Sequence, residues 1–87
     1  MPTVYIPPQI RSLTGGVETI EITASSVREI VTQLEERFPG VRDRLCQGDE
    51  LRPGLSVSVG NQISSVGMYQ KVPTDAEVHF IPAIGGG

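Results

Sequence analysis

Alternation of apolar and polar residues marks four short segments of the chain as β-strands. In each segment every second side chain is apolar, so one face of the strand would be buried and the other would remain accessible. The four segments are 3–7, 17–23, 55–60 and 76–82. The first two flank a turn at 12–16 that contains two glycines, which tolerate the backbone angles of a tight reversal. This arrangement predicts a β-hairpin.

Between the second and third of these segments the apolar period changes to that of an α-helix. The apolar stripe consists of Val27, Ile30, Val31, Leu34 and Phe38. Ser26 stands three residues before Glu29 and predicts a capping box at the start of the helix. Pro39-Gly40 ends it. A further helical turn or two is expected over 41–48, a loop over 49–54, short irregular pieces over 61–72 and a turn at 73–75.

The order of these elements is strand, strand, helix, short helix, strand, irregular segment, strand. It predicts an α+β domain in which a mixed sheet of four to five strands packs on one main helix. This is the order of the β-grasp, or ubiquitin-like, roll. A chain of 87 residues supports one domain. We expect the β-grasp domain to span 1–82 and to be followed by a flexible C-terminal glycine tail, 83–87.

Composition and charge exclude several functional classes. The net charge is −3, whereas a non-specific nucleic-acid binder needs a basic surface, so no nucleic-acid partner is expected. No apolar run is long enough to cross a membrane, and no basic start followed by an apolar run suggests a signal peptide. The single cysteine, Cys46, excludes an internal disulfide. The expected location is therefore the cytoplasm.

Two side chains are candidates for chemistry of their own. His79 has the side chain of a general base, but its position in the last strand, on the face opposite Val78 and Phe80, is that of an exposed residue without a catalytic role. Cys46 is either a nucleophile that works with His79 or a small core residue. One histidine and one cysteine do not make a zinc site. We therefore expect no catalytic residue and no bound metal, and a small hydrolase built on this pair remains the alternative.

The C-terminal sequence HFIPAIGGG has a different character. Gly85, Gly86 and Gly87 have no side chains, so an extended strip of them passes through a channel that any Cβ would block. Fully extended, the five residues 83–87 reach about 17 Å, enough to carry a terminal carboxylate into the active site of another protein. The alternative is a frayed end with no function.

The residues before the glycines suggest how a partner would hold this tail. Val78 and Phe80 are expected to face the core, so Ile81 would point outward beside the tail as a docking contact. Alternatively, its own sheet covers Ile81 in part. Pro82 would stiffen the exit of the chain, and Ile84 would anchor the tail in a groove of the partner.

A small β-grasp element order that ends in PAIGGG resembles the prokaryotic ubiquitin-like sulfur carriers. They include the thiamine-pathway carrier, the small subunit of molybdopterin synthase, and the carrier that feeds sulfur to a cysteine synthase. The resemblance covers the whole chain. It extends to the stretches PPQIRSLTGG and LEERFPGVRDRL, which are most similar to the cysteine-biosynthesis and molybdopterin branch.

The resemblance implies a carrier and not an enzyme. A partner adenylyltransferase, similar to ubiquitin-activating enzymes, would use ATP and magnesium to adenylate the Gly87 carboxylate, while Gly85 and Gly86 thread its channel. Sulfur would then replace AMP and give a thiocarboxylate. The acceptor would be a biosynthetic enzyme, either a cysteine synthase or the large subunit of molybdopterin synthase. The alternatives are a modifier joined to lysines through Gly87 and a β-grasp binding module whose tail is incidental.

Overall fold

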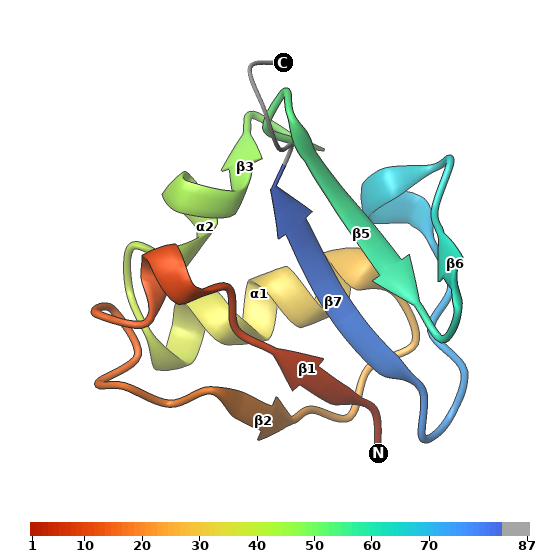
Figure 1. Ribbon diagram of the computed structural model, residues 1–87, viewed down its shortest axis with the longest axis horizontal. Coiled ribbons are helices and arrows are strands. Elements are labelled where there is room, and N and C mark those ends of the chain that lie inside the picture. Colours follow the sequence, from red (N-terminus) through yellow and green to blue (C-terminus); the bar gives the residue numbers. More distant parts are fainter. Residues whose placement is uncertain (83–87) are drawn as a thin grey trace.

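The structure is a computed structural model that describes residues 1–82; the expected tail, 83–87, lies outside the described residues. A five-stranded sheet and a small two-stranded sheet form the framework, and the two α-helices lie on one side of the larger sheet (Figure 1). In chain order the elements are β1 (Thr3–Tyr5), the 3-10 helix η1 (Pro8–Ile10), β2 (Thr19–Glu21), α1 (Val27–Arg37), α2 (Val41–Leu45), β3 (Cys46–Gln47), β4 (Glu50–Leu51), β5 (Leu55–Val59), β6 (Gln62–Ile63), the 3-10 helix η2 (Gly67–Tyr69) and β7 (Glu77–Pro82).

The first and last strands lie side by side in the larger sheet, whose order is β2-β1-β7-β5-β6. β1 pairs antiparallel with β2, as the predicted hairpin requires, and parallel with β7. β5 pairs antiparallel with both β7 and β6. This mixed sheet, with one main helix across it, confirms the predicted β-grasp roll.

The start of α1 is fixed by side chains that accept its free backbone N–H groups. The hydroxyl of Ser26, at the N-cap, accepts a hydrogen bond from the backbone N–H of Glu29 at 3.2 Å. The carboxylate of Glu29 reaches back one residue further than in a standard capping box and accepts from the N–H of Ser25 at 2.9 Å. The predicted helix start is confirmed.

One face of α1 supplies much of the core. Val27, Ile30, Val31 and Leu34 are fully buried, as the helical spacing predicts. The sheet residues that share this core cluster are Val4, Val57, Val78 and Phe80, together with Ile22, which directly follows β2. Phe38, expected in the same stripe, is only partly buried, because it is the C-cap and its non-helical backbone takes it out of the helical register. Burial of these apolar side chains is the main force that holds helix to sheet.

The structure corrects the prediction for 41–54. α2 is present and buries Val41 and Leu45, but the helix ends there and does not continue to residue 48. The expected loop over 49–54 begins with a strand, because β3 and β4 form a short antiparallel pair around Gly48, whose φ is +68°. Strands of two residues are too short to produce a detectable alternation.

Residues 61–72 contain the short pieces that the sequence predicts. η2 buries Met68 and leaves Tyr69 exposed. In β5, Val57 is fully buried, whereas Leu55 and Val59, also expected to face inward, are only partly buried. These two side chains are only partly buried because β5 lies next to the edge strand β6, which is only two residues long.

Candidate functional site

The last strand, β7, brings the chain to one end of the sheet. Its first half lies between β1 and β5, with Val78 paired to both Val4 and Val59. Its second half extends beyond β1 and pairs with β5 alone, where Pro82 lies opposite Leu55. The segment that follows Pro82 therefore starts from a strand that is anchored in the sheet.

The side chains of β7 alternate as the sequence predicts. Val78 and Phe80 face the core, and His79 and Ile81 lie on the opposite face, where both are half-buried. Ile81 is thus directed outward and is also partly covered, so both of the expected features are present. Pro82 is exposed. The other predicted site residues, Ile84, Gly85, Gly86 and Gly87, lie outside the described residues.

An aromatic pair occupies the centre of the outer sheet face. Tyr5 lies opposite His79 in the parallel β1–β7 pair, and their rings stack with centroids 4.1 Å apart and an angle of 11° between the planes. The His79 Nε2 atom lies 3.3 Å from a carboxylate oxygen of Glu77. On the side of β7 away from Tyr5, Ser58 of β5 lies opposite both His79 and the exposed Ile63 of β6.

We call the outward-facing residues Tyr5, Ile63, His79 and Ile81 the outer band. The sequence analysis singled out His79 and Ile81 but not their neighbours. The outward direction of Tyr5 follows from the alternation of Val4 and Ile6, which are both buried. Its contact with His79 depends on the register between the first and last strands, which no local pattern specifies.

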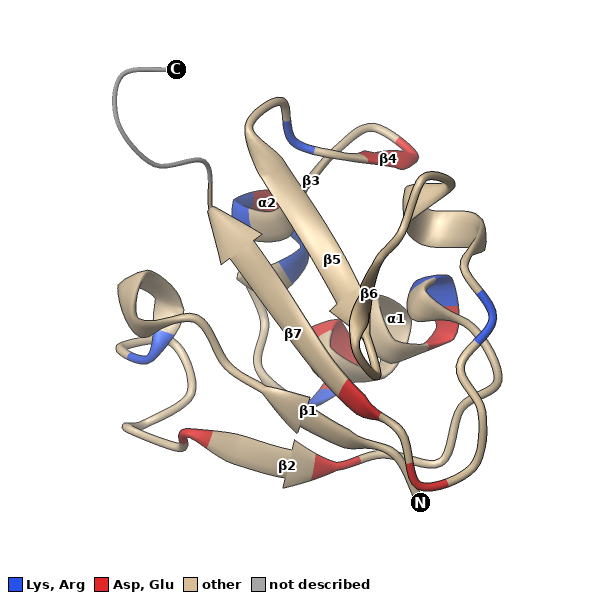
Figure 2. Cartoon of the chain, turned by 45° about the vertical axis from the view of Figure 1, so that its right-hand side comes forward, with Lys and Arg blue, Asp and Glu red and all other residues tan. Residues whose placement is uncertain are grey.

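The charged residues in the strands of the large sheet are of one sign. The five strands of the large sheet contain no lysine or arginine, and their only carboxylates are Glu21 and Glu77. Both glutamates pair with Thr3 across the strands, at the end of the sheet away from Pro82. Figure 2 shows that the lysine and arginine positions fall on the helices and connecting loops instead. The outer face is therefore apolar near the chain exit and acidic farther away.

The residues proposed for an independent catalytic role do not come together. Cys46 belongs to the core, where its Sγ atom lies 3.8 Å from the sulfur of Met68, and burial raises the pKa of its thiol. His79 lies on the outer face of the sheet. Within 1–82, no group of three or more His, Cys, Asp or Glu side chains is arranged to hold a metal ion. No helix in that range is long and apolar enough to cross a membrane.

Comparison with known proteins identifies similar structures but no matching family model. No protein-family model and no curated protein sequence matches the chain. Among solved structures, the Amycolatopsis orientalis BexX/CysO complex contains a chain that is 29% identical, with a TM-score of 0.90 and full coverage of both chains. Mycobacterium tuberculosis CysO is 22% identical, with a TM-score of 0.86 over 97% of this chain and 100% of that one.

A modifier protein is also among the matches. The small archaeal modifier protein SAMP1 of Methanosarcina acetivorans is 16% identical, with a TM-score of 0.79 over 99% of this chain and 95% of that one. At this identity the likeness shows the fold alone. Together these matches confirm the resemblance that the sequence indicated: the chain is similar to the ubiquitin-like sulfur carrier and modifier proteins.

Proposed function

We propose that this chain is a sulfur carrier whose C-terminal Gly87 becomes a thiocarboxylate. One observation carries the proposal: a β-grasp domain similar to CysO places its last strand in the sheet, and the sequence runs from the end of that strand directly into Ala-Ile-Gly-Gly-Gly. Such a domain presents a narrow carboxylate terminus from a firmly held base. The described side chains provide no paired nucleophile and base, and the reaction needs none from this protein.

The chemistry proceeds in two substitutions on a partner adenylyltransferase. A carboxylate oxygen of Gly87 attacks the α-phosphorus of magnesium-bound ATP, and pyrophosphate leaves. Sulfide then attacks the carbonyl carbon of the acyl-adenylate, and AMP leaves as the C–S bond forms. Gly85 and Gly86 contribute their small cross-section to the passage through the partner's channel. Activation is required because a free carboxylate is a poor electrophile.

The outer band is the proposed docking surface for that partner. Ile81 lies closest in sequence to the tail, and Tyr5 and His79 continue the surface along the sheet. A complementary partner would present apolar side chains near the chain exit and basic side chains toward Glu21 and Glu77. Pro82 restricts the direction in which the chain leaves the sheet, and Ile84 would occupy a groove of the partner.

The sulfur acceptor is proposed to be a biosynthetic enzyme of cysteine or molybdopterin-cofactor formation. Similarity to CysO favours the cysteine branch. A second function, conjugation of Gly87 to lysine side chains, is the alternative, because it would use the same glycine tail and the same activated carboxylate. Both functions begin with the same adenylate and differ in the nucleophile that replaces AMP, which is sulfide in one and a lysine amine in the other.

Reconstitution tests the proposal. The full chain is incubated with a candidate adenylyltransferase, magnesium-ATP and sulfide, and its intact mass is measured. We expect a product heavier by one oxygen-to-sulfur exchange, and none from a control chain that lacks Gly86 and Gly87. If sulfide produces no heavier species but added protein substrates give isopeptide-linked products, the modifier function replaces the carrier function. If neither product forms, both proposals fail.

A further inference from the structure

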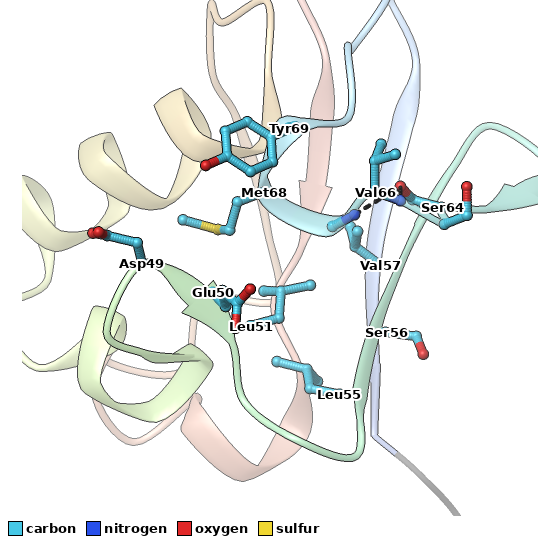
Figure 3. Close-up of a pocket in the computed structure, with 12 residues that line it drawn as sticks. Asp49, Glu50, Leu51, Leu55, Ser56, Val57, Ser64, Val66, Met68 and Tyr69 are labelled. Atoms are coloured by element: carbon cyan, nitrogen blue, oxygen red, sulfur yellow. Dashed lines mark hydrogen bonds between the residues drawn. The ribbon is translucent and has the colours of Figure 1, made fainter.

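A groove beside β5, at the edge of that strand away from β7, is not used by the proposed carrier chemistry. It has a volume of about 320 Å³ and lies between β4, β5 and the 64–69 segment (Figure 3). Leu51, Leu55, Val57 and Met68 provide its apolar lining. Val66 and Tyr69 border it and are 52% and 72% exposed. Large apolar side chains this exposed at the border of a groove indicate a binding surface.

The wall of the groove is held in place by local hydrogen bonds. The hydroxyl of Ser64 accepts from the backbone N–H groups of Val66 at 3.0 Å and Gly67 at 3.1 Å, and it donates to the Gln70 side chain at 2.7 Å. Gly67 has a φ of +54°, which favours glycine, and a Cβ at this position would make an ordinary van der Waals contact with Leu51 at 3.8 Å. The groove is therefore preformed, and a ligand would not have to order it.

Beside the groove, the edge of β5 is open. β6 pairs with β5 only at Ser58 and Val59, and Ser64 adds one hydrogen bond to the Val57 carbonyl at 2.8 Å. Nearer its start, β5 has β7 on one side and no paired strand on the other within 1–82. Because residues two apart direct their backbone groups to the same edge, the Leu55 carbonyl and the Val57 N–H both face this open edge.

An open strand edge next to a groove that can accept side chains is the arrangement by which proteins bind an extended peptide as an added strand. The backbone groups of the peptide bond to the edge, and alternate side chains enter the groove. In Figure 3 the hydroxyl of Ser56 is directed away from the cavity. A peptide residue opposite Ser56 would thus have its side chain on the far side, and its neighbours would face the groove.

The charges at the groove indicate the chemistry of that peptide. Among residues 1–82, the charged residues that line it are Asp49 and Glu50, and no lysine or arginine does so. Asp49 already has Arg42 at 3.4 Å, whereas Glu50 makes no ion pair within the described part of the chain. A lysine or arginine on the peptide would complement Glu50, and an acidic peptide would be repelled.

We propose that this groove binds an extended segment of a partner protein that carries an apolar side chain flanked by lysine or arginine. The segment adds a short strand to β5, with one of its N–H groups donating to the Leu55 carbonyl and one of its carbonyls accepting from the Val57 N–H. Because Leu55 pairs with Pro82, the bound segment lies one strand away from the exit of the tail. This interface is distinct from the outer band and does not rest on the sulfur-carrier function.

Peptide titration of the full ¹⁵N-labelled chain, followed by NMR, tests the proposal. The probe is the acetylated and amidated peptide Lys-Val-Ile-Val-Lys. We expect saturable shifts confined to the groove residues, together with slower hydrogen exchange at the Val57 amide. Two matched peptides serve as controls. Lys-Val-Pro-Val-Lys lacks the central N–H, and Glu-Val-Ile-Val-Glu reverses the charge; both should bind at least about fivefold more weakly.

Variants of the chain complete the test. Glu50→Lys should weaken binding of the lysine peptide about fivefold, whereas Glu36→Lys, the same charge change on the exposed side of α1, should leave it unchanged. Shifts that map to the outer band, or equal binding of the proline peptide, would overturn the proposal. Absence of binding at millimolar probe would also overturn it. So would groove shifts without peptide that depend on protein concentration or on removal of 83–87, because the occupant would then be a second copy or the chain's own tail.

Discussion

Two substitutions in the same strand separate docking from folding. Ile81 and Val78 are three residues apart in β7 but face opposite sides of the sheet. Val78 is fully buried in the core, whereas Ile81 is half-buried on the outer band. If the outer band is the surface that the adenylyltransferase contacts, Ile81→Ala should impair activation and Val78→Ala should impair stability.

The magnitudes follow from burial. Val78→Ala removes two buried carbon groups and leaves a cavity, which lowers the free energy of unfolding by about 2 kcal/mol. For a domain of this size, that corresponds to a fall in Tm of about 10 °C. Ile81→Ala removes a side chain that is only partly covered, and it should lower the free energy of unfolding by about 1 kcal/mol or less. At a docked interface, loss of the same side chain should lower kcat/KM for adenylation about tenfold.

The assay is pyrophosphate release by the adenylyltransferase at varied concentrations of the carrier, with urea unfolding measured on the same preparations. The expected result is a crossed pattern. Ile81→Ala should have low kcat/KM with nearly parental stability, and Val78→Ala should be less stable but should be activated normally while it is folded. If Ile81→Ala is activated as fast as the parent chain, the assignment of the outer band as the docking surface is wrong.

Three further substitutions test particular contacts. Ser26→Ala should destabilise the fold by about 1 kcal/mol through loss of the α1 cap, and unchanged urea unfolding would contradict this role. The backbone N–H groups of Arg42 and Gly40 donate to the Glu35 carboxylate and hold its pKa below the ordinary value of 4.5, so Glu35→Gln should be less stable than the parent at neutral pH. That difference should fade as the pH falls through the lowered pKa, and unfolding curves at a series of acidic pH values would reveal a constant difference if the reasoning is wrong. Cys46→Ser should destabilise the core, because a hydroxyl replaces a buried thiol. The variant should still acquire sulfur at Gly87 in the reconstituted reaction. If Cys46 were catalytic, the substitution would abolish this sulfur transfer.

Local patterns predicted the elements in which many residues repeat one period. The stripe of α1 extends over three turns, and its capping serine is adjacent in sequence, so both its start and its buried face could be predicted. The alternation in β7 likewise identified Val78 and Phe80 as core residues and Ile81 as outward-facing. These predictions succeeded because the interactions that determine them are local or strictly periodic.

The features that the sequence did not reveal depend on contacts between distant segments. β3 and β4 have two residues each, and their pairing is determined by the turn at Gly48 and by the packing of β4 against η2. The Tyr5–His79 stack requires the parallel register of two strands that are more than seventy residues apart. The peptide groove likewise needs β4, β5 and the 64–69 segment to meet, so its lining residues are scattered along the chain.

The most direct test of the carrier function is the intact mass of this protein purified from its own cells under mild conditions. The account predicts a fraction of molecules that are heavier by one oxygen-to-sulfur exchange, with the extra mass located in the C-terminal peptide that ends at Gly87. If the protein carries only a plain carboxylate there, both in cells and after incubation with the adenylyltransferase, ATP and sulfide, the sulfur-carrier function is contradicted.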